Sequence, residues 1–141
     1  EAGIEAAVIG STSGQITRIT QEVVAKGLVR LGIITKEDEF RTYYPHGAAH
    51  HIGLDVHDLS NYGPFKADAI ITVEPGIYVP KDSPCDPKWW GIGIRIEDDV
   101  LITENGPINL SANAPRSWEA IEELMKESSP LDQFLLPELE K

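Results

Sequence analysis

The sequence predicts a mixed α+β domain in which one long helix precedes a group of short strands and a second helix follows them. Three observations indicate this arrangement: a capped apolar pattern of helical spacing over 13–31, short β-branched runs broken by Gly and Pro over 42–110, and a Ser-capped amphipathic segment from Ser117. The chain has 141 residues, which suits one domain with one core.

The first helix has a start and a stop signal. Thr12 and Gln15 fit a capping box, and Gly32 follows the last residue of the apolar pattern. We therefore predict a helix over 13–31, whose apolar positions are Ile16, Ile19, Val23, Leu28 and Leu31. Residues 1–10 fit either a helix end or a strand, and residues 35–39 are expected to form a polar connection.

The central part of the chain is expected to supply the sheet. The predicted strands are 69–73, 76–79, 92–97 and 100–103. Residues 92–97 alternate between Ile and other residues, so this strand should present two different faces. A proline-rich loop over 81–88, a bend or bulge at Asp98-Asp99 and a turn at 104–107 are expected between the strands.

The end of the chain divides into a helix and a tail. Ser117 is the predicted N-cap, and the apolar face consists of Trp118, Ile121, Leu124 and Met125. Residues 128–141 contain prolines and are expected to be poorly ordered. We therefore assign residues 1–127 to the domain and 128–141 to a C-terminal tail.

Composition excludes several classes of function. A formal net charge of −11 argues against nucleic acid as a partner, because phosphate binding requires clustered Lys and Arg. The single cysteine, Cys85, rules out an internal disulfide and a cysteine-based zinc site. No apolar run is long enough to span a bilayer, so membrane association is not expected. These features together favour a cytoplasmic location.

All of the histidines fall within residues 46–57, which points to a metal site. Imidazole is the commonest protein ligand for metals, and His50 is the best candidate. His46 shares a face with His50 in a helix or in a strand. His57 is an odd number of residues from both, so it can reach the same site only across a bend, which Gly53 could provide. His51 should point to the opposite face as a structural residue.

Two glutamates and an arginine complete the candidate site. Glu74 ends an apolar strand directly before Pro75-Gly76. Glu97 shares a strand face with Arg95, and its burial would be costly without a cation. Arg95 could orient a neighbouring carboxylate. Each residue has an ordinary alternative, such as a structural histidine, a surface ion pair or a solvated Asp98-Asp99 pair, and only the combination points to metal chemistry.

The segments that carry these residues also resemble a known family, the Xaa-Pro peptidases. This aminopeptidase P and prolidase group has the pita-bread (creatinase/aminopeptidase-like) fold. The similar segments are Tyr44–Asp58, Thr72–Tyr78 and Gly91–Thr103. The resemblance spans roughly 13–125 and implies the C-terminal portion of the catalytic domain, with a curved, mostly antiparallel sheet and flanking helices. His57-Asp58 and the run from Arg95 to Asp99 favour this group over the methionine aminopeptidases.

The resemblance implies a metal-dependent peptidase that acts on peptides with proline at the second position. His50, Glu74 and Glu97 would be ligands of two divalent ions, with Glu97 between them. Manganese is the first expectation, and zinc or cobalt are the alternatives. Among the catalytic residues, His46 and His57 would bind substrate or move protons. Glu74 would accept a proton from water, and Arg95 would support the ligands.

The sequence departs from the family pattern in one respect. The family also uses two aspartates from an upstream β-hairpin, but Asp38 is the only aspartate before His46 and lies in a polar segment. We therefore expect this chain to be part of the catalytic domain and to be inactive alone. A prolidase and a non-catalytic pita-bread binding module remain alternatives, and a homo-oligomer stays open.

Overall fold

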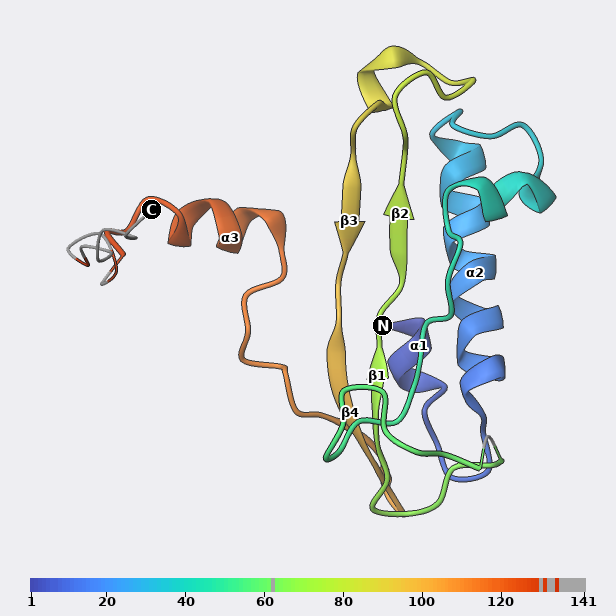
Figure 1. The fold of residues 1–141 in the computed structure, drawn as a ribbon, viewed down its shortest axis with the longest axis vertical. Coiled ribbons are helices and arrows are strands. Elements are labelled where there is room, and N and C mark those ends of the chain that lie inside the picture. The colour runs from blue at the N-terminus through green and yellow to red at the C-terminus, as the bar shows by residue number, and fades with distance from the viewer. Residues whose placement is uncertain (62, 130, 132–133, 135–141) are drawn as a thin grey trace, which may run out of the picture.

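A computed structural model describes residues 1–61, 63–129, 131 and 134 (Figure 1). A ribbon of strands runs beside the long helix α2, and α3 lies away from both (Figure 1). The helices are α1 (Ala2–Glu5), α2 (Ser13–Arg30) and α3 (Trp118–Leu124), with 3₁₀ turns η1 (Glu37–Thr42) and η2 (Pro87–Trp89). The strands are β1 (Ile70–Val73), β2 (Gly76–Tyr78), β3 (Gly93–Arg95), β4 (Asp98–Thr103) and β5 (Gly106–Asn109).

The strands form two antiparallel sheets that share one register. β1, β4 and β5 lie in that order in one sheet, while β2 pairs with β3 in the other. β1 pairs with β4 so that Val73 lies opposite Asp98, and β2 pairs with β3 so that Gly76 lies opposite Arg95. The same alignment continues through both sheets. It is interrupted only around Glu74-Pro75 and the residues opposite, where proline has no N–H to donate.

The segment that carries the histidines, residues 44–60 (the histidine segment), extends this sheet on the other side of β1. His51 forms a β-bridge with Ile71, and the Glu74 N–H donates to the Ala48 carbonyl at 2.8 Å. The Thr72 N–H donates to the His50 carbonyl at 2.9 Å. Residues 48–52 therefore run antiparallel to β1, which lies between them and β4.

One face of β1 and β4 packs against the helices. Thr12 caps α2 through a capping box with Gln15, as the sequence predicts. The buried side chains between α2, α1 and the sheet are Ala7, Ile16, Phe65, Ile71, Val73, Val100 and Ile102. Because side chains alternate along a strand, Thr72 and Glu74 face the opposite side of β1 from this core.

A second buried cluster joins the far end of α2 to the β2–β3 sheet. It consists of Leu28, Ile33, Ile34, Tyr43 and Val79. Cys85, Trp89 and Trp90 pack against it from the loop after β2, so the proline-rich segment is a packed cap rather than a free loop.

The predicted strands 69–73 and 76–79 are confirmed, but two local predictions are wrong. The strand predicted over 92–97 is shorter, and the break lies at 96–97 instead of at Asp98-Asp99, which begin β4. Asp98 is not a solvated charge, because it is buried and forms an ion pair with Arg116 at 3.0 Å. The segment 35–39 is an exposed polar connection, as predicted, and its second half forms the start of η1. Glu39 stabilises this turn by accepting the N–H groups of residues 35 and 36.

The C-terminal region differs from the sequence prediction in its packing. Ser117 caps α3 as predicted, yet no residue of α3 is buried, and Trp118 is 68% exposed. β5 was not predicted, because Gly106 and Pro107 read as part of a turn. Most of the predicted tail over 128–141 lies outside the described residues.

The core around Ile16 should carry much of the stability. Ile16 is fully buried between α2 and the sheet, so Ile16→Ala should lower the free energy of unfolding by about 2–5 kcal/mol. Val23→Ala on the same helix is the matched control. Val23 is 55% exposed and should change the value by no more than about 0.5 kcal/mol. Urea denaturation measures both, and equal effects would contradict this assignment of the core.

Candidate metal centre

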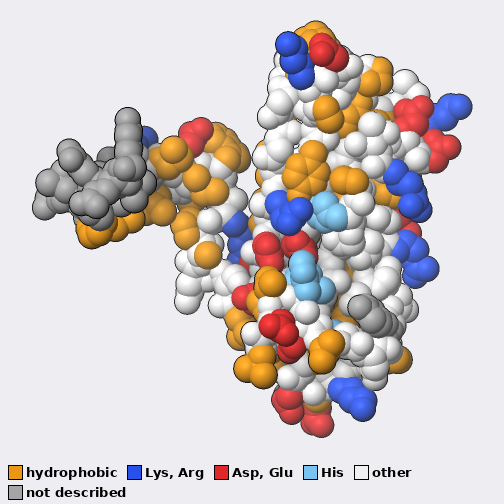
Figure 2. Space-filling model, viewed as in Figure 1, with side chains coloured by type: hydrophobic (Ala, Val, Ile, Leu, Met, Phe, Trp, Pro, Cys, Tyr) orange, Lys and Arg blue, Asp and Glu red, His pale blue; other side chains and the backbone are white. Residues whose placement is uncertain are grey.

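A hollow of about 560 Å³ lies beside the break between the two sheets. Figure 2 shows histidine, acidic and basic side chains gathered on one face of the body. The lining residues come from the histidine segment, α2 and the strand ends: Ser13, His46, Gly47, Ala49, His50, His51, His57, Asp58, Ser60, Glu74 and Arg95. The structure therefore brings His46, His50, His57, Glu74 and Arg95 to one place, as the sequence predicts.

Both ring nitrogens of His50 lie beside oxygen acceptors. Its Nδ1 lies 2.9 Å from the His51 carbonyl oxygen, which can only accept, so Nδ1 must carry a proton. Nε2 lies 3.0 Å from Oε1 of Glu74. A contact this short between Nε2 and a carboxylate requires a proton on Nε2 or a cation that both groups bind.

Glu74 and Glu97 lie opposite each other at the break in the sheet. Continuing the β1–β4 register by one residue places them on the same face, although Glu74 is buried and Glu97 is exposed. Ligand atoms of His50, Glu74 and Glu97 all lie within 4.8 Å of one another. Because metal–ligand bonds are about 2.0–2.2 Å long, two ligands of one ion lie about 3–4 Å apart, so a divalent cation would hold these atoms somewhat closer than the upper bound of 4.8 Å.

A bend in the histidine segment returns His57 to His50. The Asp58 N–H donates to the His51 carbonyl at 3.0 Å, which closes the bend that begins at Gly53. The His57 ring then contacts the His50 ring edge-on, with centroids 4.5 Å apart. The predicted route for His57 across a bend is confirmed. The His51 ring contacts Phe65, in keeping with its predicted structural role.

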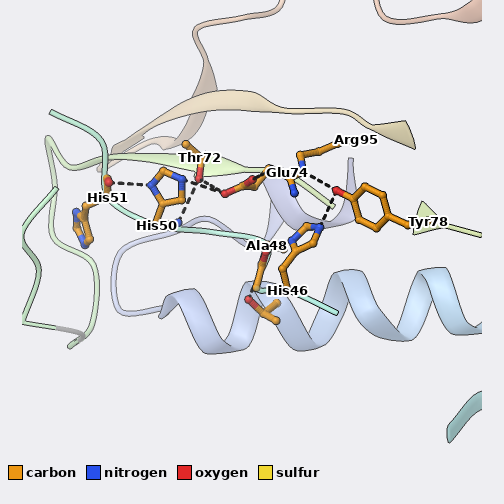
Figure 3. A network of polar contacts seen from close by, with 10 residues as sticks. His46, Ala48, His50, His51, Thr72, Glu74, Tyr78 and Arg95 are labelled. Atoms are coloured by element: carbon orange, nitrogen blue, oxygen red, sulfur yellow. Dashed lines mark hydrogen bonds and ion pairs between the residues drawn. The ribbon is translucent and has the colours of Figure 1, made fainter. Parts of the chain in front are cut away.

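A phenol that was not predicted links His46 to Arg95 (Figure 3). Arg95 donates from Nε to the Tyr78 hydroxyl at 2.7 Å, and this hydrogen bond raises the pKa of Arg95. The hydroxyl proton is then free for His46 Nε2 at 3.0 Å, because His46 Nδ1 faces the Gly47 carbonyl. Arg95 Nη1 also lies 3.4 Å from Oε2 of Glu74. Arg95 therefore contacts the carboxylate of Glu74, as the sequence predicts.

The structure identifies two site residues that were not singled out from the sequence, Tyr78 and Thr72. Thr72 donates to Oε1 of Glu74 at 3.3 Å. Both residues are an even number of positions from Glu74, so a shared strand face was the available signal. Asp38 does not join the site, because it lies in η1 and lines a separate hollow beside α2.

Helix α2 anchors the histidine segment through two threonines. Thr17 accepts the Ala48 N–H at 3.0 Å, and Thr20 shares a hydrogen bond of 2.9 Å with the hydroxyl of Tyr44. The buried ring of Tyr44 lies edge-on to His46, with centroids 5.2 Å apart. The position of His46 therefore depends on its packing against α2.

The family follows from comparison with known proteins. Residues 1–104 match the model of metallopeptidase family M24, and the chain belongs to this family. It is 39% identical over 128 residues to the Xaa-Pro aminopeptidase of Escherichia coli, covering 82% of the chain and 29% of that protein. It is also 39% identical over 119 residues to the mitochondrial intermediate cleaving peptidase 55 of Arabidopsis thaliana, covering 82% of the chain and 24% of that protein.

Solved structures agree with the assignment. The aminopeptidase PepP of Pseudomonas aeruginosa superposes with a TM-score of 0.82 at 35% identity, covering 89% of this chain and 31% of that one. E. coli aminopeptidase P with the inhibitor Pro-Leu gives 0.80 at 36%, covering 88% and 31%. The predicted pita-bread fold is confirmed. The chain spans about a quarter to a third of the length of these relatives. No helix in the described part of the chain is suited to crossing a membrane.

Burial of Tyr44 gives stability a defined dependence on pH. Burial raises the pKa of the Tyr44 phenol, whereas the pKa of an unfolded tyrosine is about 10. The neutral phenol should therefore contribute its full stability below about pH 10 and lose it as pH rises through the folded-state pKa. Tyr44→Phe should make the loss of stability above pH 10 shallower, as denaturation at several pH values can measure. An unchanged slope would contradict the predicted linkage.

Proposed function

We propose that this chain supplies part of the active site of a metal-dependent Xaa-Pro aminopeptidase, which hydrolyses the peptide bond before a proline at the second position. The observation that carries the proposal is the convergence of His50, Glu74 and Glu97, whose ligand atoms all lie within 4.8 Å of one another, with His50 Nε2 3.0 Å from Oε1 of Glu74. Membership of the peptidase family and the Xaa-Pro aminopeptidases among its relatives support the same reaction class.

His50, Glu74 and Glu97 would hold the metal. Two divalent ions, when bound, would lower the pKa of a water molecule and polarise the scissile carbonyl. Manganese suits the carboxylates, while imidazole also accepts zinc or cobalt. A zinc-substituted E. coli aminopeptidase P with product is among the similar structures. Two ions need more donors than these residues provide, so the proposal requires further carboxylates, which the family resemblance implies to be two aspartates.

The residues around the ligands would bind substrate and move protons. Glu74 is the proposed general base, and Arg95 would hold its Oε2 so that the carboxylate keeps one orientation. His46 and His57 line the same hollow as His50, where they would contact the substrate. The hydrogen bond from Tyr78 fixes the ring of His46.

The peptide bond proposed to be cleaved in this hollow lacks an N–H. An Xaa-Pro peptide bond is a tertiary amide, so its nitrogen donates no hydrogen bond and the site need not offer an acceptor to it. The proposed substrate is therefore a peptide with a free amino terminus and proline second. The inhibitor Pro-Leu in the structure of a relative contains proline as well.

Loss of a ligand should abolish the proposed activity. The full-length protein that carries this chain should cleave an Xaa-Pro peptide with Mn²⁺ present. Glu97→Ala should lower kcat/KM by at least about 100-fold, since even indirect metal supports are worth about 10–100-fold. Glu104→Ala is the matched control, because Glu104 is an exposed acidic residue in the turn after β4.

The same assay separates the alternatives. Activity that survives both metal removal and Glu97→Ala would contradict the proposal. Stoichiometric metal without any cleavage would favour a non-catalytic binding module. Cleavage restricted to dipeptides would assign a prolidase instead of an aminopeptidase.

A further inference from the structure

We propose that Thr72 is a positioning residue for the metal centre, whose hydroxyl sets the relative placement of His50 and Glu74. This inference rests on the proposed function, because it concerns the same metal ligands. Thr72 lies in the middle of β1, is fully buried, and contacts both ligands through one oxygen atom (Figure 3).

The backbone pairing between His50 and Thr72 lacks one of the two hydrogen bonds of a regular antiparallel pair. The Thr72 N–H donates to the His50 carbonyl at 2.9 Å, as an antiparallel ladder requires. In a regular ladder the His50 N–H would return to the carbonyl of residue 72. It donates instead to the Thr72 hydroxyl, with His50 N and Thr72 Oγ1 3.2 Å apart. The side chain therefore replaces the main chain as the acceptor.

The hydroxyl has a single arrangement that satisfies all three groups. A hydroxyl carries one proton and two lone pairs, and here a lone pair accepts from His50 N–H. The proton must then go to Oε1 of Glu74 at 3.3 Å, since an ionised carboxylate can only accept. This directed chain orients both the backbone of one metal ligand and the carboxylate of another.

The chemistry favours a role at the metal over a role in packing alone. Oε1 is also the atom of Glu74 that lies 3.0 Å from His50 Nε2. A donated hydrogen bond to this oxygen holds the carboxylate where it faces His50 Nε2, as partners of metal ligands commonly do. Valine matches threonine in shape but would leave the His50 N–H and Oε1 without this partner.

The experiment titrates the full-length protein with Co²⁺ and Mn²⁺ and compares variants at residue 72. Thr72→Val should weaken metal affinity by about 10–100-fold and change the visible Co²⁺ absorption spectrum. Thr72→Ser keeps the hydroxyl and should bind within about threefold of the parent protein. Thr103→Val is the matched control, because its hydroxyl donates to the Gly106 carbonyl in the turn after β4. It should leave affinity and spectrum unchanged.

A second pair of variants covers the case in which Thr72→Val does not fold. Thr72→Ala and Thr72→Ser both lack the methyl group and differ in the hydroxyl, so Ser should bind metal at least about 10-fold more tightly than Ala. Equal affinities within either comparison, Val with Thr or Ala with Ser, would overturn the role of the hydroxyl. Failure of the unchanged protein to bind either ion would instead overturn the proposed metal centre, and the inference with it.

Discussion

The shared register of the strands is the constraint on which the site depends. One antiparallel alignment runs through β1–β4 and β2–β3, and it places Glu74 opposite Glu97 and Gly76 opposite Arg95. Since side chains alternate between faces, Glu74, Arg95 and Glu97 come to the same side. A slip of one residue would turn Glu74 toward the helices and Val73 toward the hollow. Burial of Ile71 and Val73 against α1 and α2 therefore fixes the chemistry on the other face.

His46 and His50 differ in what their second ring nitrogen meets. His46 Nε2 accepts a hydrogen bond from the Tyr78 hydroxyl, whose oxygen in turn accepts from Arg95. His50 has the same pattern at Nδ1, but its Nε2 faces a carboxylate oxygen. This difference supports the proposal that His50 binds metal and that His46 contacts substrate.

The sequence predicts the long helix and most strands, because each depends on local spacing. The ligand set rests on the family resemblance and stays a prediction, although the structure brings His50, Glu74 and Glu97 together. The capping box at Thr12 and the Pro75-Gly76 break act over a few residues, and the odd separation of His57 required a bend that the structure contains. It could not predict that Asp98 would be buried, since its partner Arg116 lies far along the chain. Thr72 and Tyr78 were missed for the same reason: their roles come from cross-strand neighbours, which only the register determines.

A crystal structure of the full-length protein grown with Mn²⁺ and measured near its absorption edge would locate the bound ion. We expect an anomalous peak within bonding distance of His50 Nε2 and of carboxylate oxygens of Glu74 and Glu97. We also expect His50 Nδ1 to stay hydrogen-bonded to the His51 carbonyl. An ion bound elsewhere, or His50 still paired directly with Glu74 at saturating Mn²⁺, would contradict the proposed metal centre.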